Sequence, residues 1–294
     1  MKVVVTGASG LIGSALVPHL REQGHEVLSL VRRTPASRHQ ARWDPDEGRI
    51  DVAALQGTDA VVHLAGAGVG DHRWTASYKR TILQSRVDGT TLISRTIAEL
   101  DPAPRVLVSA SGIDYYPDTD TEVTERSGRG TAFLSDVVEA WEGATASARE
   151  AGIAVSYARS ALVLARKGGV LERLRPLVNL GLAGPIGPGD QWWSWITLDD
   201  QVRALTRLLD GDLPGPVNLS SPDPVPQREL VRALARQAHR PAILPAPTFA
   251  LRAAVGQFSE TIVASHRVVP RRLLDAGFTF EHPTLADAVR WVSS

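Results

Sequence analysis

Short apolar runs alternate along the first half of the chain with longer stretches that carry apolar residues at helical spacing. The apolar runs predict strands at 3–5, 27–31, 59–64, 105–109 and 153–158. The stretches between them predict helices at 11–20, 74–100 and 131–152. Strands that alternate with helices of this length form βαβ units with helices on both faces of a parallel sheet. We therefore predict an α/β fold of Rossmann type, which is a doubly wound parallel sheet.

The pattern changes after about residue 160. Glycine and proline crowd 181–189 and 214–226, and shorter helices are predicted at 199–209, 227–237 and 284–292. We assign 1–160 to a dinucleotide-binding Rossmann domain and 161–294 to a smaller α+β lobe, with the unit near 191–219 as a candidate to rejoin the sheet. A cleft between such parts is where doubly wound proteins bind ligands.

Composition narrows the class of protein. The chain has 294 residues, 32 Lys+Arg, 32 Asp+Glu and no cysteine. A formal net charge of zero argues against nucleic acid and anionic membranes as partners. Without cysteine there is no disulfide or thiolate chemistry, and no histidine pair has the spacing of a metal site, so we predict no metal. No apolar run approaches the roughly 20 residues of a membrane span. The N-terminus does not have the pattern of a signal peptide, so the expected location is cytoplasmic.

A glycine-rich turn separates the first predicted strand from the first predicted helix, in the sequence from Thr6 to Gly13. Gly7 allows a tight turn, Gly10 leaves room for a pyrophosphate, and Gly13 lets the helix pack close to the sheet. The N–H groups that begin the helix, at Leu11 and Ile12, favour bound phosphate. The alternative is a tight turn without a ligand. No Lys-Ser/Thr pair follows, so the turn is not a P-loop.

The end of the second predicted strand indicates which dinucleotide binds. An NAD site places a carboxylate there to bind the ribose 2′-hydroxyl, but this chain has Arg32 and Arg33. The guanidinium group matches a 2′-phosphate in charge and shape. We therefore predict NADP(H) as the cofactor, with Arg38 and Arg42 close enough to share the role. The alternative to a phosphate site is that Arg32 and Arg33 are a solvated basic pair at the end of the strand.

The glycine turn and the segment from Asp59 to Gly66 resemble those of the extended short-chain dehydrogenase/reductase superfamily. The resemblance is closer to a subgroup called epimerase family proteins, through Arg73-Trp74, through 109–116 and through a tail at about 246–294 that is similar to a C-terminal domain of unknown function. The resemblance covers nearly the whole chain and implies a Rossmann fold and NADP binding. It implies no particular substrate.

The chain departs from the superfamily in its catalytic residues. The superfamily uses Tyr-x-x-x-Lys on one helix, where the lysine lowers the pKa of the tyrosine that moves the proton. No tyrosine of this chain has a lysine four residues later, and the aligned positions hold Phe133 and Val137. Ser111 stands at the position of the superfamily's catalytic serine. Tyr115 or Tyr116 on the following loop is the candidate proton donor, and packing at the rim is the alternative for both; Asp114 is a third candidate.

The resemblance places further residues near the cofactor. Arg86 replaces an asparagine in a segment that lines the cofactor, and it is expected to contact the cofactor rather than form a structural ion pair. Arg159 either lines the cleft or pairs with a carboxylate. The full set of expected cofactor residues is Gly7, Gly10, Leu11, Ile12, Gly13, Arg32, Arg33, Leu64, Ala65, Gly66, Thr81, Arg86, Ser109, Arg159 and Leu162.

Two functions of different classes remain open. The first is an NADP(H)-dependent oxidoreductase or epimerase-like enzyme that acts on a small organic substrate, in which Ser111 polarises the substrate oxygen. Sugar-nucleotide epimerisation ranks below simple reduction, because the C-terminal lobe has no obvious basic cluster for a second pyrophosphate. The second is an NADP(H)-binding sensor without turnover, which the missing Tyr/Lys pair favours. Either protein would be a monomer or a homodimer.

Overall fold

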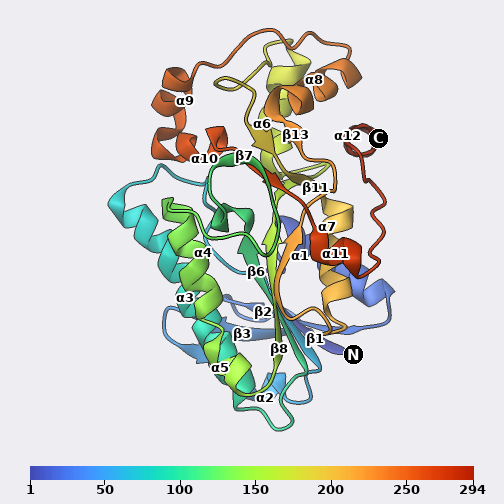
Figure 1. Ribbon diagram of the computed structural model, residues 1–294. Coiled ribbons are helices and arrows are strands. Elements are labelled where there is room, and N and C mark those ends of the chain that lie inside the picture. The colour runs from blue at the N-terminus through green and yellow to red at the C-terminus, as the bar shows by residue number, and fades with distance from the viewer.

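A computed structural model describes residues 1–294. Eight strands form one twisted sheet, shown side-on in Figure 1. From edge to edge they are β12 (Gly215–Leu219), β8 (Ala154–Ser160), β6 (Val106–Gly112), β5 (Ala60–His63), β1 (Lys2–Thr6), β2 (Glu26–Val31), β3 (Gln40–Asp44) and β4 (Arg49–Ile50). All neighbours pair in parallel except β4, which runs antiparallel to β3. The predicted Rossmann-type fold is confirmed.

The chain begins in the middle of this sheet and builds outward in two directions. From β1 it proceeds to β2 and β3, and it then crosses to β5, β6, β8 and β12 on the other side. The strand order therefore reverses beside the carboxyl ends of β1 and β5. Doubly wound proteins bind their ligands at this point, since the connecting loops diverge there and leave a crevice.

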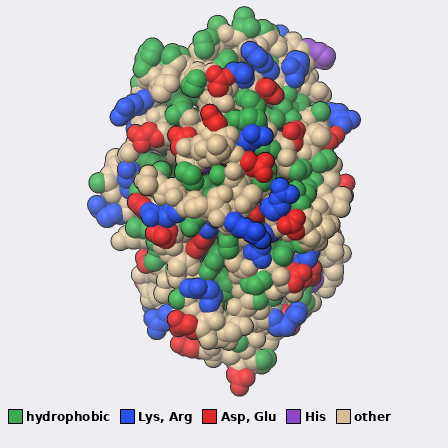
Figure 2. Space-filling view, viewed as in Figure 1, with side chains coloured by type: hydrophobic (Ala, Val, Ile, Leu, Met, Phe, Trp, Pro, Cys, Tyr) green, Lys and Arg blue, Asp and Glu red, His purple; other side chains and the backbone are tan.

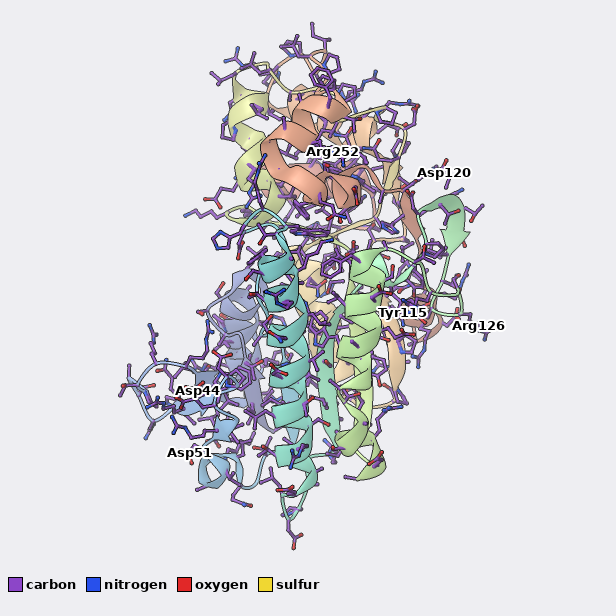
Figure 3. All side chains as sticks on the ribbon, turned by 90° about the vertical axis from the view of Figure 1, so that its left-hand side faces the viewer. Asp44, Asp51, Tyr115, Asp120, Arg126 and Arg252 are labelled. Atoms are coloured by element: carbon purple, nitrogen blue, oxygen red, sulfur yellow. The ribbon has the colours of Figure 1, made fainter.

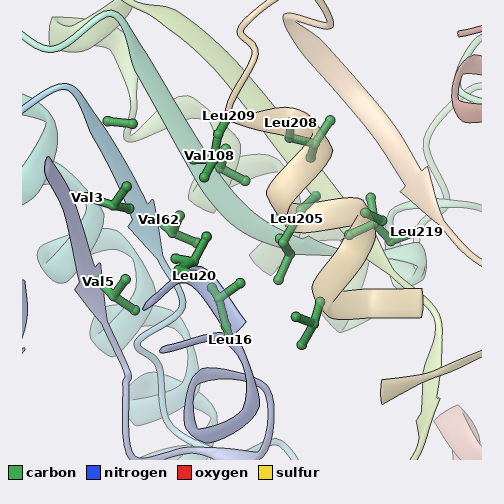
Figure 4. Packing of buried hydrophobic residues seen from close by; sticks show 14 of the residues in the cluster. Val3, Val5, Leu16, Leu20, Val62, Val108, Leu205, Leu208, Leu209 and Leu219 are labelled. Atoms are coloured by element: carbon green, nitrogen blue, oxygen red, sulfur yellow. The ribbon is translucent and has the colours of Figure 1, made fainter. Parts of the chain in front are cut away.

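Helices cover both faces of the sheet (Figure 1). One face carries α1 (Leu11–Glu22), α7 (Leu198–Leu208) and α11 (Arg271–Asp275). The other face carries α2 (Val52–Leu55), α3 (Ala76–Ala98), α4 (Phe133–Gly143) and α5 (Ala146–Glu150). Alternate residues of each strand point to opposite faces, so Val3 and Val5 pack with α1 while Val4 packs with α3. Figure 4 shows the first of these cores, in which Leu16 and Leu20 meet Leu205 and Leu208.

The smaller lobe lies beyond the carboxyl edge of the sheet (Figure 1). Its elements are β9 (Leu162–Leu164), α6 (Gly169–Asn179), β10 (Trp192–Trp193), β11 (Trp195–Thr197), β13 (Val225–Pro226), α8 (Gln227–Gln237), α9 (Thr248–Val255), η2 (Gly256–Phe258), α10 (Ser259–Val263), β14 (His266–Val268) and α12 (Leu285–Ser293). Between β6 and α4 lie η1 (Ile113–Tyr115) and β7 (Thr119–Val123), and β14 pairs with β7. The C-terminal tail thus packs directly on the loop that carries Tyr115.

Among the differences from the sequence prediction are a break in one helix and an additional strand, β3. The predicted helix at 131–152 is two helices, because Thr145 leaves the helical path and its hydroxyl donates to the carbonyl of Glu142. The strand β3 was not predicted, since only Ala41 and Trp43 give its short alternating pattern. Acidic and basic side chains are interspersed over the face in Figure 2, in keeping with the balanced composition. No helix is long and apolar enough to cross a membrane.

Candidate functional site

The glycine turn forms a compact cradle at the start of α1. Gly7 has a φ of +65°, and a Cβ there would lie 2.8 Å from the carbonyl carbon of Leu64. The Gly10 N–H donates to the Gly7 carbonyl at 3.0 Å. A Cβ on Gly13 would overlap the same carbonyl, so α1 can approach the turn only with glycine there. Gly10 caps α1 without a side-chain hydrogen bond, which leaves N–H groups of the first turn free for an anion.

A buried contact between β1 and β5 shapes the other side of this cradle. Thr6 Oγ1 lies 2.8 Å from His63 Nδ1, and it accepts hydrogen bonds from the N–H groups of Leu64 at 3.0 Å and Ala65 at 3.2 Å. The backbone that leads to Gly66 is therefore fixed at the carboxyl edge. Burial lowers the pKa of His63 to about 4, so this histidine is neutral and structural.

Arg86 of α3 holds the segment that follows. Its Nη1 donates to the carbonyls of Ala67 at 2.9 Å and Ile82 at 3.0 Å. A Cβ on Gly66 would lie only 3.4 Å from Arg86 Cγ. The Arg86 guanidinium also stacks 4.9 Å from the ring centroid of Trp141. The structure thus brings Arg86 to the expected cofactor segment 64–66, where part of its hydrogen-bonding capacity is used by the protein itself.

Helix α3 also directs polar side chains towards residues 67–68. The Tyr78 hydroxyl donates to the Gly68 carbonyl at 2.5 Å, and Ser85 Oγ accepts from the Ala67 N–H at 3.1 Å. Thr81 lies between them at helical spacing and is exposed. Thr81 therefore shares a helix face with Tyr78 and Ser85 and stays a candidate cofactor residue.

The two arginines after β2 are exposed and form no ion pair. Arg42 of β3 is also exposed and unpaired, and its strand neighbour in register is Val31. Arg38 contacts only His39, at 3.3 Å. Arg32 and Arg33 thus follow β2 directly, beside the end of β1 that leads into the glycine turn, and have no acidic partner there.

Ser111 has a partner that the sequence did not indicate. Its hydroxyl donates to Glu142 Oε1 at 2.7 Å, and Arg159 donates to both oxygens of the same carboxylate at 2.8 Å. Of the two roles expected for Arg159, the structure shows the ion pair. Glu142 was missed because it lies on α4 among other acidic residues, and only the fold brings Arg159 beside it.

The two tyrosines of the loop have different environments. The Tyr116 side chain is 1% exposed, and its hydroxyl donates to Asn218 Oδ1 at 2.7 Å and accepts from Arg159 Nη1 at 3.1 Å. Burial raises the pKa of Tyr116 to about 12. These contacts remove Tyr116 from the candidate proton donors.

Tyr115 is half-buried, and its ring lies 3.5 Å from the Arg159 guanidinium carbon. Unlike that of Tyr116, its hydroxyl has no hydrogen-bond partner in the protein. Figure 3 shows Tyr115 beside α4, far from Asp44 and Asp51 at the other edge of the sheet. Burial raises the pKa of the neighbouring Asp114 carboxyl, and interactions with His266 and Arg86 oppose this rise. Tyr115 and Asp114 remain the candidate proton donors of this loop.

Near the carboxyl edge of the sheet lie three other residues that were expected at the cofactor site. Ser109 is fully buried on β6, two residues before Ser111. Leu162 begins β9 and pairs with Trp195. Leu11 packs against the glycines of the 168–169 turn, where a Cβ would come within about 3 Å of its methyl groups.

Comparison with known proteins agrees with this architecture. The NAD dependent epimerase/dehydratase family model matches residues 3–219. The chain belongs to this family. The domain of unknown function DUF1731 matches residues 246–292, which is the tail that packs on the Tyr115 loop. The resemblance inferred from the motifs is therefore confirmed.

Several family members are similar over nearly their whole length. An epimerase family protein of Mycobacterium leprae is 41% identical over 99% of this chain and 95% of its own. The chloroplastic SDR39U1 homologue of Arabidopsis thaliana is 35% identical over 99% of this chain and 86% of its own. A crystal structure of human SDR39U1 with NADPH has a TM-score of 0.91 and 29% identity, and covers 100% of this chain and 99% of the human one.

The positions aligned with the Tyr/Lys pair of the superfamily are apolar in this family member. Phe133 packs edge-on against Trp74 with ring centroids 5.2 Å apart, and Val137 is buried. The Lys79 ammonium lies 4.7 Å from the Phe133 ring centroid, so a lysine lies near this position but from α3 rather than α4.

Proposed function

We propose that the protein binds NADP(H) and transfers a hydride between it and a small organic substrate. The observation that carries the proposal is the pair of unpaired arginines, Arg32 and Arg33, at the carboxyl end of β2. Their guanidinium groups suit a ribose 2′-phosphate, which NADP(H) carries and NAD(H) lacks. The human relative crystallised with NADPH supports the same assignment.

The residues present fit this cofactor. The missing Cβ of Gly10 and the free N–H groups at Leu11 and Ile12 suit a pyrophosphate. We assign Leu64, Ala65, Gly66, Thr81 and Arg86 to the wall of the crevice along α3, and Ser109 and Leu162 to its floor. The bound cofactor supplies or accepts the hydride, and the protein must orient the substrate and move the proton.

We assign the role of proton donor to Tyr115. Its hydroxyl has no hydrogen-bond partner in the protein, and the guanidinium of Arg159 packs against its ring and holds the ring in place. General acid catalysis contributes about 10²- to 10⁴-fold, so we expect Tyr115→Phe to lower turnover by a factor in this range. Ser111 orients the reacting oxygen.

Cofactor titration tests the binding half of the proposal. Fluorescence titration should show NADPH bound more tightly than NADH. Arg32→Ala and Arg33→Ala should each weaken NADPH by about 10- to 100-fold, the loss typical of a charged hydrogen bond, with little effect on NADH. Arg232→Ala, which removes an exposed arginine of α8 in the other lobe, is the matched control. Equal affinity for NADH and NADPH would refute the assignment.

A sensor without turnover is the second candidate. It is favoured by Phe133 and Val137 at the positions of the Tyr/Lys pair, and by the buried state of Tyr116. NADPH oxidation and NADP⁺ reduction over a panel of carbonyl, quinone and alcohol substrates distinguish the two functions. A rate abolished by Tyr115→Phe identifies the enzyme, whereas tight NADPH binding without turnover identifies the sensor.

A further inference from the structure

Aromatic side chains from three separate segments meet where α3 and α4 begin. The Trp74 ring centroid lies 5.2 Å from that of Phe133, the first residue of α4, and 5.6 Å from that of Phe258 in η2 of the tail. All three residues of this aromatic cluster are partly exposed. Helices that follow parallel strands begin at the carboxyl edge of the sheet, so the cluster lies at the same edge as the glycine turn. Figure 3 shows α3 and α4 side by side, with the tail helices beyond their upper ends.

Lys79 of α3 lies over this aromatic cluster. Its ammonium is 5.7 Å from the ring centroid of Trp74 and 4.7 Å from that of Phe133. The side chain is half-buried, and the ammonium has neither an ion pair nor a hydrogen bond. Asp71, the one acidic residue between β5 and α3, lies against Gly68 and does not pair with it. The rings attract the positive charge, but they are much weaker hydrogen-bond acceptors than an oxygen atom.

Cations from the neighbouring segments are engaged by the protein itself. The Arg73 guanidinium donates to the carbonyl of Ala253 in the tail, and Arg173 Nη2 donates to the carbonyl of Gly70 at 3.0 Å. These arginines therefore hold the loop before α3 against the smaller lobe. Lys79 differs because its three N–H groups have no oxygen partner. Its charge is available to an anion that comes from outside the protein.

The aromatic cluster lies next to the loop that carries the assigned proton donor. Two residues after Phe133, the Ser135 hydroxyl donates to the carbonyl of Asp114 at 2.7 Å. Asp114 directly precedes Tyr115 in the chain. The start of α4 and the Tyr115 loop are thus held together, and a molecule bound on the cluster lies beside this loop.

The chemistry of this region fits a carboxylate on an apolar body. One ammonium balances the single charge of a carboxylate, whereas a phosphate or pyrophosphate carries more charge and suits a group of cations. Partly exposed aromatic rings favour contact with apolar and planar groups. Phe133 is suited to this role, since it presents an apolar ring where the superfamily has a phenol.

We propose that Lys79 binds a carboxylate of the substrate and that the aromatic cluster holds the apolar part of the same molecule. This inference rests on the proposed function and adds the substrate class, which is a small apolar carbonyl compound that carries a carboxylate. The carboxylate anchors the substrate and takes no part in the hydride transfer.

Titration with unreactive acids tests this binding site without turnover. Benzoate, phenylacetate and 3-phenylpropionate are titrated by calorimetry into the protein with and without NADPH, each beside its neutral amide. At least one acid should bind at least about tenfold more tightly than its amide, as expected for one charged hydrogen bond. The inference is overturned if none of the acids binds more tightly than its amide, or if inorganic phosphate binds as tightly as the acids.

Variants of Lys79 assign the preference to its charge. Lys79→Met keeps the apolar stem over the rings, so it should melt within a few degrees of wild type and bind the acid no better than the amide. Lys79→Arg retains the charge and should retain the preference for the acid. Arg80→Met removes the neighbouring exposed cation and is the matched control, in which the preference should be unchanged. A preference that survives in Lys79→Met would overturn the assignment.

A crystal structure of the wild-type protein with the tightest acid provides a test that needs no variant. The carboxylate should lie about 3 Å from Lys79 Nζ, and a carboxylate bound elsewhere contradicts the inference.

Kinetics extend the test to substrates. Oxo acids should react in preference to their amides, and Lys79→Met should raise KM for the acids by about 10- to 100-fold with a smaller change in kcat. A change confined to kcat would argue against an anchoring role. Failure of the proposed function is recognised separately, as absence of NADPH binding or of turnover, whereas the acid titration requires neither.

Discussion

The hydroxyl of Thr6 donates its hydrogen to Nδ1 of His63 across the two central strands. The two atoms lie 2.8 Å apart, and Thr6 Oγ1 already accepts the N–H groups of Leu64 and Ala65. The Thr6 hydrogen is therefore free only for His63, which makes Nδ1 the acceptor and places the ring proton on Nε2. Nε2 is buried without a hydrogen-bond partner, and the ring meets the Trp43 ring edge-on at 5.9 Å between centroids.

This neutral histidine makes stability dependent on pH. Burial lowers the pKa of His63 from 6.5 to about 4, so between these values the unfolded chain binds more protons than the folded one. The contribution of His63 to stability is present above pH 6.5 and is lost as the pH falls towards 4. At about 1.4 kcal/mol per pKa unit, the loss approaches about 3 kcal/mol.

Urea unfolding of wild type and His63→Asn at several pH values measures this effect. Asparagine can accept the Thr6 hydrogen but does not titrate, so the stability difference between the two proteins should shrink as the pH falls from 7 to 4. The same change at the exposed His72 is the control. A stability difference that stays constant over this range would contradict the prediction.

The glycines of the turn should respond differently to substitution. Gly13→Ala places a methyl group onto the Gly7 carbonyl, so we predict loss of several kcal/mol of stability and of cofactor binding together. In Gly10→Ala the new Cβ lies 3.3 Å from the same carbonyl. That variant should fold with a nearly unchanged melting temperature but bind NADPH at least about tenfold more weakly, since the methyl group occupies the phosphate site.

Calorimetry combined with NADPH titration separates the two outcomes. Gly128→Ala is the matched control, because nothing lies within 4 Å of its Cβ position and its φ is not in the left-handed region. The interpretation of the turn as a phosphate cradle would be wrong if Gly10→Ala bound NADPH as tightly as wild type.

The candidate cofactor residues could be proposed from the sequence because their signals are local. Gly7, Gly10 and Gly13 lie within a single turn, and Arg32 follows directly on an apolar run. Each of these residues is recognisable from its neighbours in the chain, and the spacing alone places the group between a strand and a helix.

The contacts around Ser111 and Tyr116 could not be predicted in the same way, because the partners are distant in sequence. Glu142 contacts Ser111, which lies 31 positions away, and Tyr116 contacts Asn218, which lies 102 positions away. From the sequence, Glu142 is one more acidic residue of an amphipathic helix. Only the register of β6, β8 and β12 brings Arg159 next to Glu142 and buries the hydroxyl of Tyr116.

Adjacent tyrosines should therefore give opposite phenotypes. Tyr115→Phe removes a free hydroxyl, so turnover should fall while the melting temperature stays within a few degrees of wild type. Tyr116→Phe leaves Asn218 Oδ1 and Arg159 Nη1 without their partner in a buried region, which should cost about 1–3 kcal/mol of stability. Steady-state kinetics with thermal unfolding of both variants provides the comparison. If Tyr116→Phe lost turnover without losing stability, the assignment of roles would have to be reversed.

A buried carboxylate joins the end of the chain to the Rossmann domain. Asp200 of α7 is fully buried and accepts from the N–H groups of Glu281 at 2.8 Å and His282 at 2.9 Å, as well as from Arg203 Nη1 at 2.8 Å. In Asp200→Ala these donors are left without an acceptor, and we predict a loss of about 2–4 kcal/mol.

Hydrogen exchange should localise this loss to the tail. Amides of 278–294 should lose protection in Asp200→Ala more than those of the central sheet, because Asp200 is the acceptor that holds the segment leading to α12. Asp210→Ala removes an exposed carboxylate at the end of the same helix, whose ion pair with Arg207 should contribute less than about 1 kcal/mol. Uniform loss of protection over the sheet and the tail would show that the tail unfolds only with the whole protein, and would contradict a separate anchoring role for Asp200.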